Sequence, residues 1–321
     1  MKPNKHYLLL LVALATLTGI AHAERREIPI IDIHSQFDQH VSPERVLQTA
    51  KSSGVEMIFL STRGRAEIQE LIDMHLLAPE CIVPAVRSKG GIFFSNSPRY
   101  YQRLELQGNN PLFGAKAEII LEHGKKGDRA HEYRVSINEP QAMAAVRLGI
   151  TKGWPVILHY EFAWLEQKYG TAEKQKILAE LSALLERYPD HPFGLMHMGQ
   201  LNIQEVEWFL IQHPNVFFIT SRTTPNVIRN SPHPWTPMFR GSRLARDWER
   251  LIIQYPDRFV LAFDAVFEHN WGRGYERRVH FWRRALDRLP EDVARAIAHQ
   301  NAERLWGLPP TQVNGGCSQL P

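Results

Sequence analysis

The segment 154–198 decides the fold, because it contains one complete unit of strand, helix and strand. It opens with Trp-Pro-Val-Ile-Leu-His-Tyr (154–160), continues through the amphipathic stretch 171–188 and ends with Pro-Phe-Gly-Leu-Met-His-Met (192–198). Each outer run has an apolar core, as is typical of parallel strands that are covered on both faces. The central stretch repeats apolar residues at steps of three and four, which predicts a helix, and Tyr188-Pro189 predicts its end.

The same alternation extends along the chain in both directions. Eight apolar runs are predicted strands: Ile28–His34, Val55–Leu60, Cys81–Val86, Phe113–Leu121, Trp154–Tyr160, Pro192–Met198, Val216–Thr220 and Phe259–Asp264. Helical patterns lie between them: Pro43–Ser53, Ala66–Leu77, Pro140–Lys152, Thr171–Tyr188, Ile203–His213, Gly241–Tyr255 and Tyr275–Arg288. This order predicts an α/β fold, a (β/α)8 TIM barrel in a single domain over residues 24–310. A doubly wound open sheet is the alternative, but no Gly-x-Gly-x-x-Gly follows the first strand.

The N-terminus predicts export. Lys2 and Lys5 precede the apolar run 8–20, and Ala-His-Ala (21–23) has the small residues of a cleavage site. We therefore expect residues 1–23 to be a cleavable signal peptide and the protein to be periplasmic or secreted. An uncleaved anchor is the alternative, although the apolar run is short for a membrane span. After cleavage no stable membrane anchor is expected.

Composition indicates an ordinary globular protein. The 321 residues are 44% hydrophobic and 22% charged, and the formal charge of +4 falls to about +2 without Lys2 and Lys5. No basic stripe with interleaved aromatics is present, so no nucleic-acid partner is expected. Cys81 lies in a predicted strand and Cys317 in a Gly-rich tail (311–321) that is expected to be loose, so no bridge between the two is expected.

Polar residues interrupt the predicted strands at their C-terminal ends, where a barrel places its reactive groups. They are His34, Glu118, His159, His197 and Asp264. A single histidine in an apolar run is usually a hydrogen-bonded core residue, but five such positions in strand register favour a shared site. Imidazoles and carboxylates at one barrel mouth suit a divalent transition ion, which we expect to be zinc.

Several motifs make the resemblance specific. Asp-Ile-His (32–34), Val-Ile-Leu-His (156–159), His-Met-Gly (197–199), Phe-Asp (263–264) and the closing stretch Asn-Ala-Glu-Arg-Leu-Trp-Gly-Leu (301–308) occur in order over nearly the whole chain. Together they resemble the amidohydrolase superfamily, and within it the amidohydrolase-related branch of metal-dependent barrel hydrolases and decarboxylases.

The resemblance implies roles for these residues. His34, His159 and Asp264 correspond to metal ligands, and Glu118 to a carboxylate that can bridge two ions. His197 corresponds to a ligand of a second ion or to the group that polarises the substrate carbonyl, and Asp264 also to the catalytic base. If Lys116 instead occupies the family's strand-four lysine position, Glu118 is a supporting residue.

One position departs from the family pattern. The second histidine of strand one is Gln36 here, and an amide oxygen is a poor zinc ligand beside imidazole. Three outcomes stay open: one metal ion, a two-ion site completed by Glu118, or a barrel that has lost its metal.

Loops that follow the strands hold the candidate substrate contacts. The loop after strand seven carries Arg222, and the loop after strand eight carries Trp271. With Gln36, they are the predicted substrate-binding residues, and arginine with aromatic side chains suits a small molecule that is anionic or aromatic. A proline-stiffened lid without a binding role is the alternative.

The sequence therefore predicts an exported, metal-dependent hydrolase acting on a small ester, lactone or amide through activated water. A non-oxidative decarboxylase on the same scaffold and a catalytically degenerate periplasmic binding barrel are the alternatives. The resemblance also implies that the barrel can pair as a homodimer.

Export makes a first prediction. N-terminal sequencing of the abundant species should find Glu24 at the first position, because cleavage after Ala23 follows from the apolar run and the small residues. The protein should be recovered outside the cytoplasm. Met1 or Lys2 at the start of the abundant species would contradict the prediction.

Overall fold

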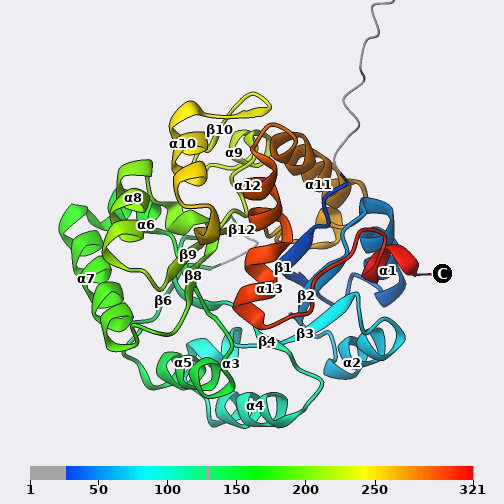
Figure 1. The fold of residues 1–321 in the computed structure, drawn as a ribbon. Coiled ribbons are helices and arrows are strands. Elements are labelled where there is room, and N and C mark those ends of the chain that lie inside the picture. Colours follow the sequence, from blue (N-terminus) through cyan, green and yellow to red (C-terminus); the bar gives the residue numbers. More distant parts are fainter. Residues whose placement is uncertain (1–26, 128–130, 321) are drawn as a thin grey trace, which may run out of the picture.

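A computed structural model describes residues 27–127 and 131–320, so the predicted signal peptide lies outside the described residues. Parallel strands form the centre of the molecule and helices surround them (Figure 1). The strands that pair in parallel are β1 (Ile31–Phe37), β2 (Met57–Thr62), β3 (Ile82–Val86), β4 (Ala115–Lys116), β5 (Ile119–His123), β7 (Val156–Tyr160), β8 (Phe193–Leu195), β9 (Val216–Ile219) and β12 (Phe259–Val260). The fold is therefore α/β with parallel sheets.

Hydrogen bonding divides these strands between two sheets. One has the order β1-β2-β3-β4, and the other has the order β12-β9-β8-β7-β5-β6, where β6 (Tyr133–Arg134) pairs antiparallel with β5. A short hairpin of β10 (Phe239–Arg240) and β11 (Arg243–Leu244) lies apart. The expected ring of eight strands is thus not closed by regular ladders.

The two gaps between the sheets have local causes. The predicted fourth strand is interrupted at Ala117-Glu118, which separates β4 from β5. The predicted eighth strand is regular only over Phe259–Val260, and beyond it the backbone reaches a left-handed conformation at Asp264 (φ 47°). Single bonds nevertheless cross the second gap, since Ile33 N donates to Leu261 O (3.2 Å) and Gln36 N to Ala265 O (2.7 Å).

Helices cover the sheets on the outside. They are α1 (Pro43–Ser53), α2 (Ile68–Leu77), α3 (Gly91–Phe94), α4 (Pro98–Asn109), α5 (Pro140–Lys152), α6 (Phe162–Tyr169), α7 (Thr171–Arg187), α8 (Ile203–Gln212), α9 (Pro225–Arg229), α10 (Arg246–Gln254), α11 (Arg273–Leu286), α12 (Glu291–Arg295) and α13 (Asn301–Trp306). The predicted bounds of α1 and α5 are confirmed. Helix α1 follows its local signals: the Ser42 side chain accepts from Arg45 N (3.3 Å), and Gly54 ends the helix at φ 69°. Of the predicted helix 241–255, only α10 is helical, because its first part forms the hairpin.

Two apolar clusters hold this arrangement. The larger packs the helices against the strands, and the smaller fills the interior with residues such as Ile31, Ile157 and Phe217. Trp306 of α13 lies against the Phe59 ring (5.0 Å between centroids) and so joins the smaller cluster. Asn301 fixes that helix, because its side-chain amide donates to Pro256 O and Phe259 O. None of the helices in residues 27–127 and 131–320 is long and apolar enough to cross a membrane.

The C-terminal segment corrects two expectations. Cys317 forms a disulfide with Cys81 across 236 residues of sequence, so the expectation that no bridge forms is wrong. Residues 311–320 are not a loose tail either, since Asn314 N donates to a Glu56 carboxylate oxygen (3.0 Å) and Cys317 N to Glu56 O (2.9 Å). Sequence spacing could not reveal the pairing, because only the folded chain brings the segment beside the start of β3.

Removing the disulfide should destabilise the protein. Replacing Cys81 and Cys317 by alanine should lower the free energy of unfolding by about 2–4 kcal/mol, since the bridge restricts a very long loop of the unfolded chain. Urea unfolding followed by tryptophan fluorescence measures the difference. Reduced wild-type protein is the matched control and should show the same loss; an unchanged midpoint in both would contradict the prediction.

Candidate metal centre

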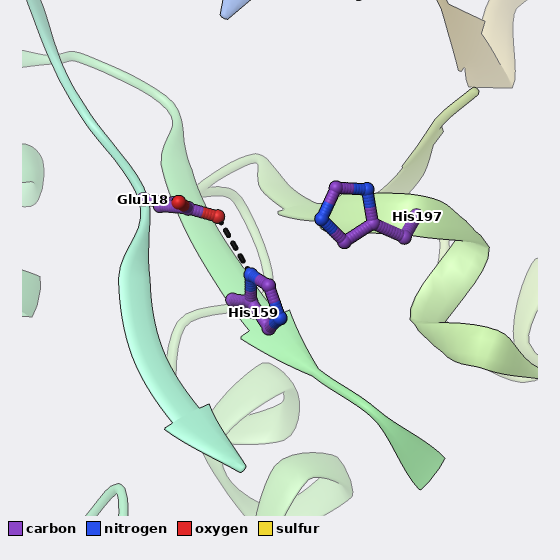
Figure 2. Close-up of side chains that lie close together, drawn as sticks. All are labelled: Glu118, His159 and His197. Atoms are coloured by element: carbon purple, nitrogen blue, oxygen red, sulfur yellow. Dashed lines mark hydrogen bonds and ion pairs between the residues drawn. The ribbon is translucent and has the colours of Figure 1, made fainter. Parts of the chain in front are cut away.

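Three buried side chains gather at the C-terminal ends of neighbouring strands. One ligand atom each from Glu118, His159 and His197 lies within 4.8 Å of the other two. Glu118 Oε2 and His159 Nδ1 are 2.7 Å apart, and the His197 ring faces this pair from a separate segment (Figure 2). Each side chain is at most 4% exposed, so charges placed here are poorly screened by water.

His159 and His197 reach the site in different ways. His159 follows ordinary strand alternation in β7, two residues after Ile157 of the interior cluster. His197 lies beyond β8 in the segment η1 (Met196–Gln200), and its backbone is left-handed at φ 54°. Such a conformation costs of order 1–3 kcal/mol for a residue other than glycine, which is typical of functional positions. The His197 Nδ1 lies 2.7 Å from Ser221 Oγ, and a bond donated to this oxygen leaves the Nε2 lone pair available.

His34 and Gln36 reach the site through an irregularity in β1. Pairing with β2 shifts register between Asp32 and Ser35, which re-aims the side chains that follow. His34 Nε2 then lies 3.4 Å from Glu118 Oε1 and 4.0 Å from Asp264 Oδ1. His34 therefore borders the group of Glu118, His159 and His197.

Asp264 is the second carboxylate near the His34 ring, after Glu118, and it is held in place by Arg222. The Arg222 Nε donates to Asp264 Oδ2 (2.7 Å), and His197 Nε2 is 3.9 Å from the same oxygen. Burial by itself would raise the pKa of Asp264, but opposing electrostatic interactions, of which the charge of Arg222 is the largest, lower this pKa to about 2. The carboxylate is therefore ionised at neutral pH.

Lys89 is a site residue that sequence reasoning missed. Its ammonium lies against Glu118 Oε1, and both side chains line the same cavity. Burial favours the neutral acid, but Lys89, His159 and His34 together hold the pKa of Glu118 well below its usual range. The available signal was its place three residues beyond the third predicted strand, where reactive side chains are expected.

A second carboxylate approaches His159 from its other ring nitrogen. Glu161 Oε1 lies 3.1 Å from His159 Nε2 and also accepts from Lys126 Nζ (2.5 Å). Burial lowers the pKa of His159, but the carboxylates of Glu118 and Glu161 outweigh it and raise the pKa above the usual value. These two contacts fix the orientation of the His159 ring.

The other predicted residues have distinct positions. Gln36 and Arg222 line the cavity, whereas Trp271 does not: it is 1% exposed, and its Nε1 donates to Gln36 O (3.2 Å). Trp271 thus supports the cavity wall instead of contacting a substrate. Lys116 donates to Ala117 O (3.0 Å) and lies beside Gly149 of α5, so it is outside the ligand group. This position disfavours Lys116 as a metal-bridging lysine.

The donor set fits a divalent transition ion. Two imidazoles and a carboxylate are ligands that zinc prefers, and three protein ligands leave a position for a substrate or water. Burial and the left-handed backbone at His197 restrict the geometry of the group. Glu118, His159 and His197 could therefore hold one ion, with His34 and Asp264 beside it.

Parallel strands with buried carboxylates and imidazoles at their C-terminal ends define a class of barrel enzyme. The sequence profile of a family described as amidohydrolase matches residues 121–308. The chain belongs to this family and is an enzyme of amidohydrolase type, as the motifs predicted. A search of curated protein sequences gives no match.

Solved structures agree in fold at low sequence identity. A TIM-barrel protein from Bordetella bronchiseptica aligns with a TM-score of 0.53 and 13% identity over 87% of this chain and 99% of its own. An amidohydrolase from Burkholderia multivorans with bound zinc aligns with a TM-score of 0.50 and 14% identity, over 88% of this chain and all of its own. A probable 2-pyrone-4,6-dicarboxylic acid hydrolase from Acinetobacter baumannii with citric acid bound gives 0.50 and 13%, over the same shares. These likenesses show a shared fold, and with the family match they support a scaffold of the amidohydrolase-type hydrolases and decarboxylases.

Two neutral histidines predict sensitivity to acid. Burial, with Lys126 nearby, lowers the pKa of His123 to about 3, and burial with His159 nearby lowers that of His197 well below its usual value. Both groups titrate near 6.5 when unfolded, so below this pH the unfolded chain binds more protons. Each histidine should then lower stability as the pH falls, by up to ~1.4 kcal/mol per unit, whereas Glu122, whose pKa burial raises to about 7, contributes in the opposite direction. The raised pKa of His159 acts only above 6.5 and does not offset this loss.

Urea unfolding of metal-free protein at pH 7.0, 6.0 and 5.5 measures the slope. His123→Gln should remove its share of the dependence, and the exposed His40→Gln should not. Equal slopes for wild type and His123→Gln would show that His123 is protonated in the folded protein.

Proposed function

We propose that this amidohydrolase is an exported hydrolase on a (β/α)8 barrel that uses one divalent ion, most naturally zinc, to cleave a small ester, lactone or amide with water. One observation carries the proposal: the buried group of Glu118, His159 and His197 lies beside an ionised Asp264. His34 completes the donors around Glu118. Family membership favours this enzyme over a barrel that only binds.

Each residue has a chemical role in the proposed reaction. A divalent ion held by Glu118, His159 and His197 supplies Lewis acidity for attack of water on an acyl group when it is bound. Asp264 accepts a proton of the attacking water at its carboxylate, which Arg222 keeps ionised. Glu161 and Glu118 hold the His159 ring in place.

Cavity charges support an anionic substrate. Around the carboxylates of Glu118 and Asp264, the cavity lining includes five cationic side chains: Arg63, Arg87, Lys89, Arg222 and Arg278. The Nε atoms of Arg87 and Arg278 are buried and have no hydrogen-bond partner within residues 27–127 and 131–320. Gln36 Oε1 is also buried and unpaired, so it can accept a bond from the substrate. A carboxylate or enolate group would satisfy the guanidinium donors, which is consistent with the predicted roles of Arg222 and Gln36.

The disulfide supports export. Bridges such as Cys81–Cys317 persist in oxidising compartments and are rare in the cytosol. Together with the sequence of residues 1–23, this favours a periplasmic or secreted protein.

The unpaired Nε atoms of Arg87 and Arg278 also fit a second candidate reaction, the non-oxidative decarboxylation of a carboxylic acid. Product analysis separates the two, since decarboxylation releases carbon dioxide and hydrolysis releases an acid with an alcohol or amine. Hydrolysis predicts that oxygen from labelled water enters the acid product.

Ligand substitutions test the metal centre. His159→Ala and His197→Ala should each reduce bound zinc from about one ion per chain to near zero, because each removes an imidazole donor. Elemental analysis of protein purified without chelators gives the stoichiometry.

His40→Ala is the matched control, since His40 is exposed and outside the group. It should retain the wild-type metal content. Circular dichroism should show intact folds in all variants, because the site lies above the packed interior. Full metal content in both ligand variants would show that His159 and His197 are not metal ligands.

A further inference from the structure

Lys89 brings a cation into the site. It lies in the loop after β3, is 9% exposed, and pairs through its ammonium with Glu118 Oε1. Burial lowers the pKa of Lys89, and the charge of Glu118 opposes this effect most strongly. The lysine therefore lies against one of the two acidic neighbours of His34.

The atoms around Lys89 are acceptors that a metal ion could use. His34 Nε2 lies 3.4 Å from Glu118 Oε1 and 4.0 Å from Asp264 Oδ1. One imidazole and two carboxylates are three protein ligands, which are enough for a transition-metal site. On this side of Glu118, however, hydrogen-bond donors occupy the lone pairs.

Gln36 provides the second of these donors. Its amide Nε2 lies 3.0 Å from His34 Nε2 and 3.5 Å from Glu118 Oε1, two atoms that can both accept. A histidine at this position would offer a lone pair, whereas the amide nitrogen offers only protons. Gln36 and Lys89 thus have the same consequence: both direct hydrogen-bond donors at atoms that a metal ion would need as ligands.

The other side of Glu118 differs. Its Oε2 faces His159 Nδ1, and the third member of that group is His197, whose pKa is held well below the usual value by burial. No lysine or arginine contact to Glu118 Oε2 occurs within residues 27–127 and 131–320. Glu118 therefore has one carboxylate oxygen that faces an imidazole able to ligate a metal ion and one oxygen that already holds the Lys89 ammonium.

We propose that the Lys89 ammonium is an internal cation that fills a second cation position of the site, beside Glu118 Oε1 and on the His34 side of this carboxylate, and so keeps a second metal ion out of that position. This inference rests on the proposed function for the first ion, at Glu118, His159 and His197. A second divalent ion would stand beside the ammonium in a poorly screened site, and like charges there repel strongly. Charge and hydrogen-bond donors together exclude it.

Zinc stoichiometry tests the proposal. Lys89→Met removes the charge and keeps the aliphatic stem, Lys89→Arg keeps the charge, and Lys89→Met with Gln36→His also supplies a ligand. Each variant is equilibrated with zinc chloride, dialysed and analysed for zinc, and its affinity is measured by competition with a chromogenic chelator. Lys168→Met, an exposed lysine paired with Glu132, is the matched control.

Wild type, Lys89→Arg and Lys168→Met should bind one ion. The double variant should bind two, and adding His34→Ala should return it to one. Lys89→Met alone should bind a second ion at least tenfold more tightly than wild type does. If circular dichroism shows that the methionine variant folds poorly, Lys89→Gln replaces it, and the same gain in affinity for a second zinc ion is expected.

Contrary outcomes are distinct. A folded double variant that still binds one ion overturns the role of Lys89, as does wild type that already binds two. If wild type binds none and the double variant binds one, Lys89 is the internal cation and the one-ion proposal for the wild type fails. If neither binds zinc, both proposals fail.

Discussion

The buried carboxylate of Asp32 is the interaction on which the site depends. It is fully buried and accepts four hydrogen bonds, from His34 N (3.1 Å), Ser35 Oγ (2.6 Å), Phe263 N (2.9 Å) and Tyr275 OH (2.7 Å). Burial raises its pKa despite these bonds. Because one side chain ties β1, the segment after β12 and α11 together, it joins the first strand to the last where the regular ladder is missing. Removing any one partner would leave the buried carboxylate with an unsatisfied hydrogen bond, so this pairing of the first and last strands is favoured over other arrangements.

That junction places His34 and Asp264 opposite each other. Ser35 Oγ adds a bond from Ala265 N (3.1 Å), and Asp264 N donates to His34 O (3.0 Å). The left-handed backbone at Asp264 is held by these contacts on both sides, as strained functional residues require. The two residues are 230 positions apart in sequence, yet their backbones are joined by a hydrogen bond.

Charge balance is the second constraint on the site. Three buried carboxylates, Glu118, Glu161 and Asp264, each have a cationic partner from a neighbouring loop: Lys89, Lys126 and Arg222. Such pairing makes ionised groups tolerable in a poorly solvated interior. A metal ion therefore enters a site whose charges are already partly compensated, which restricts both the number of ions and their position.

Sequence by itself determined the alternation of strands and helices, the bounds of α1 and α5, and the succession of His34, His159, His197 and Asp264 in or after successive strands. These depend on local periodicity and on the rule that parallel strands present their C-terminal ends together. Only the tertiary structure decided that Lys89 pairs with Glu118, that Trp271 supports Gln36 from behind, and that Cys317 reaches Cys81. Each of these contacts joins segments that are distant in sequence and have irregular backbone. Side-chain direction cannot be predicted there, because irregular backbone has no regular periodicity. The register shift in β1 and the left-handed turns at His197 and Asp264 set those directions, and both arise from packing between elements, which no single stretch of the chain encodes.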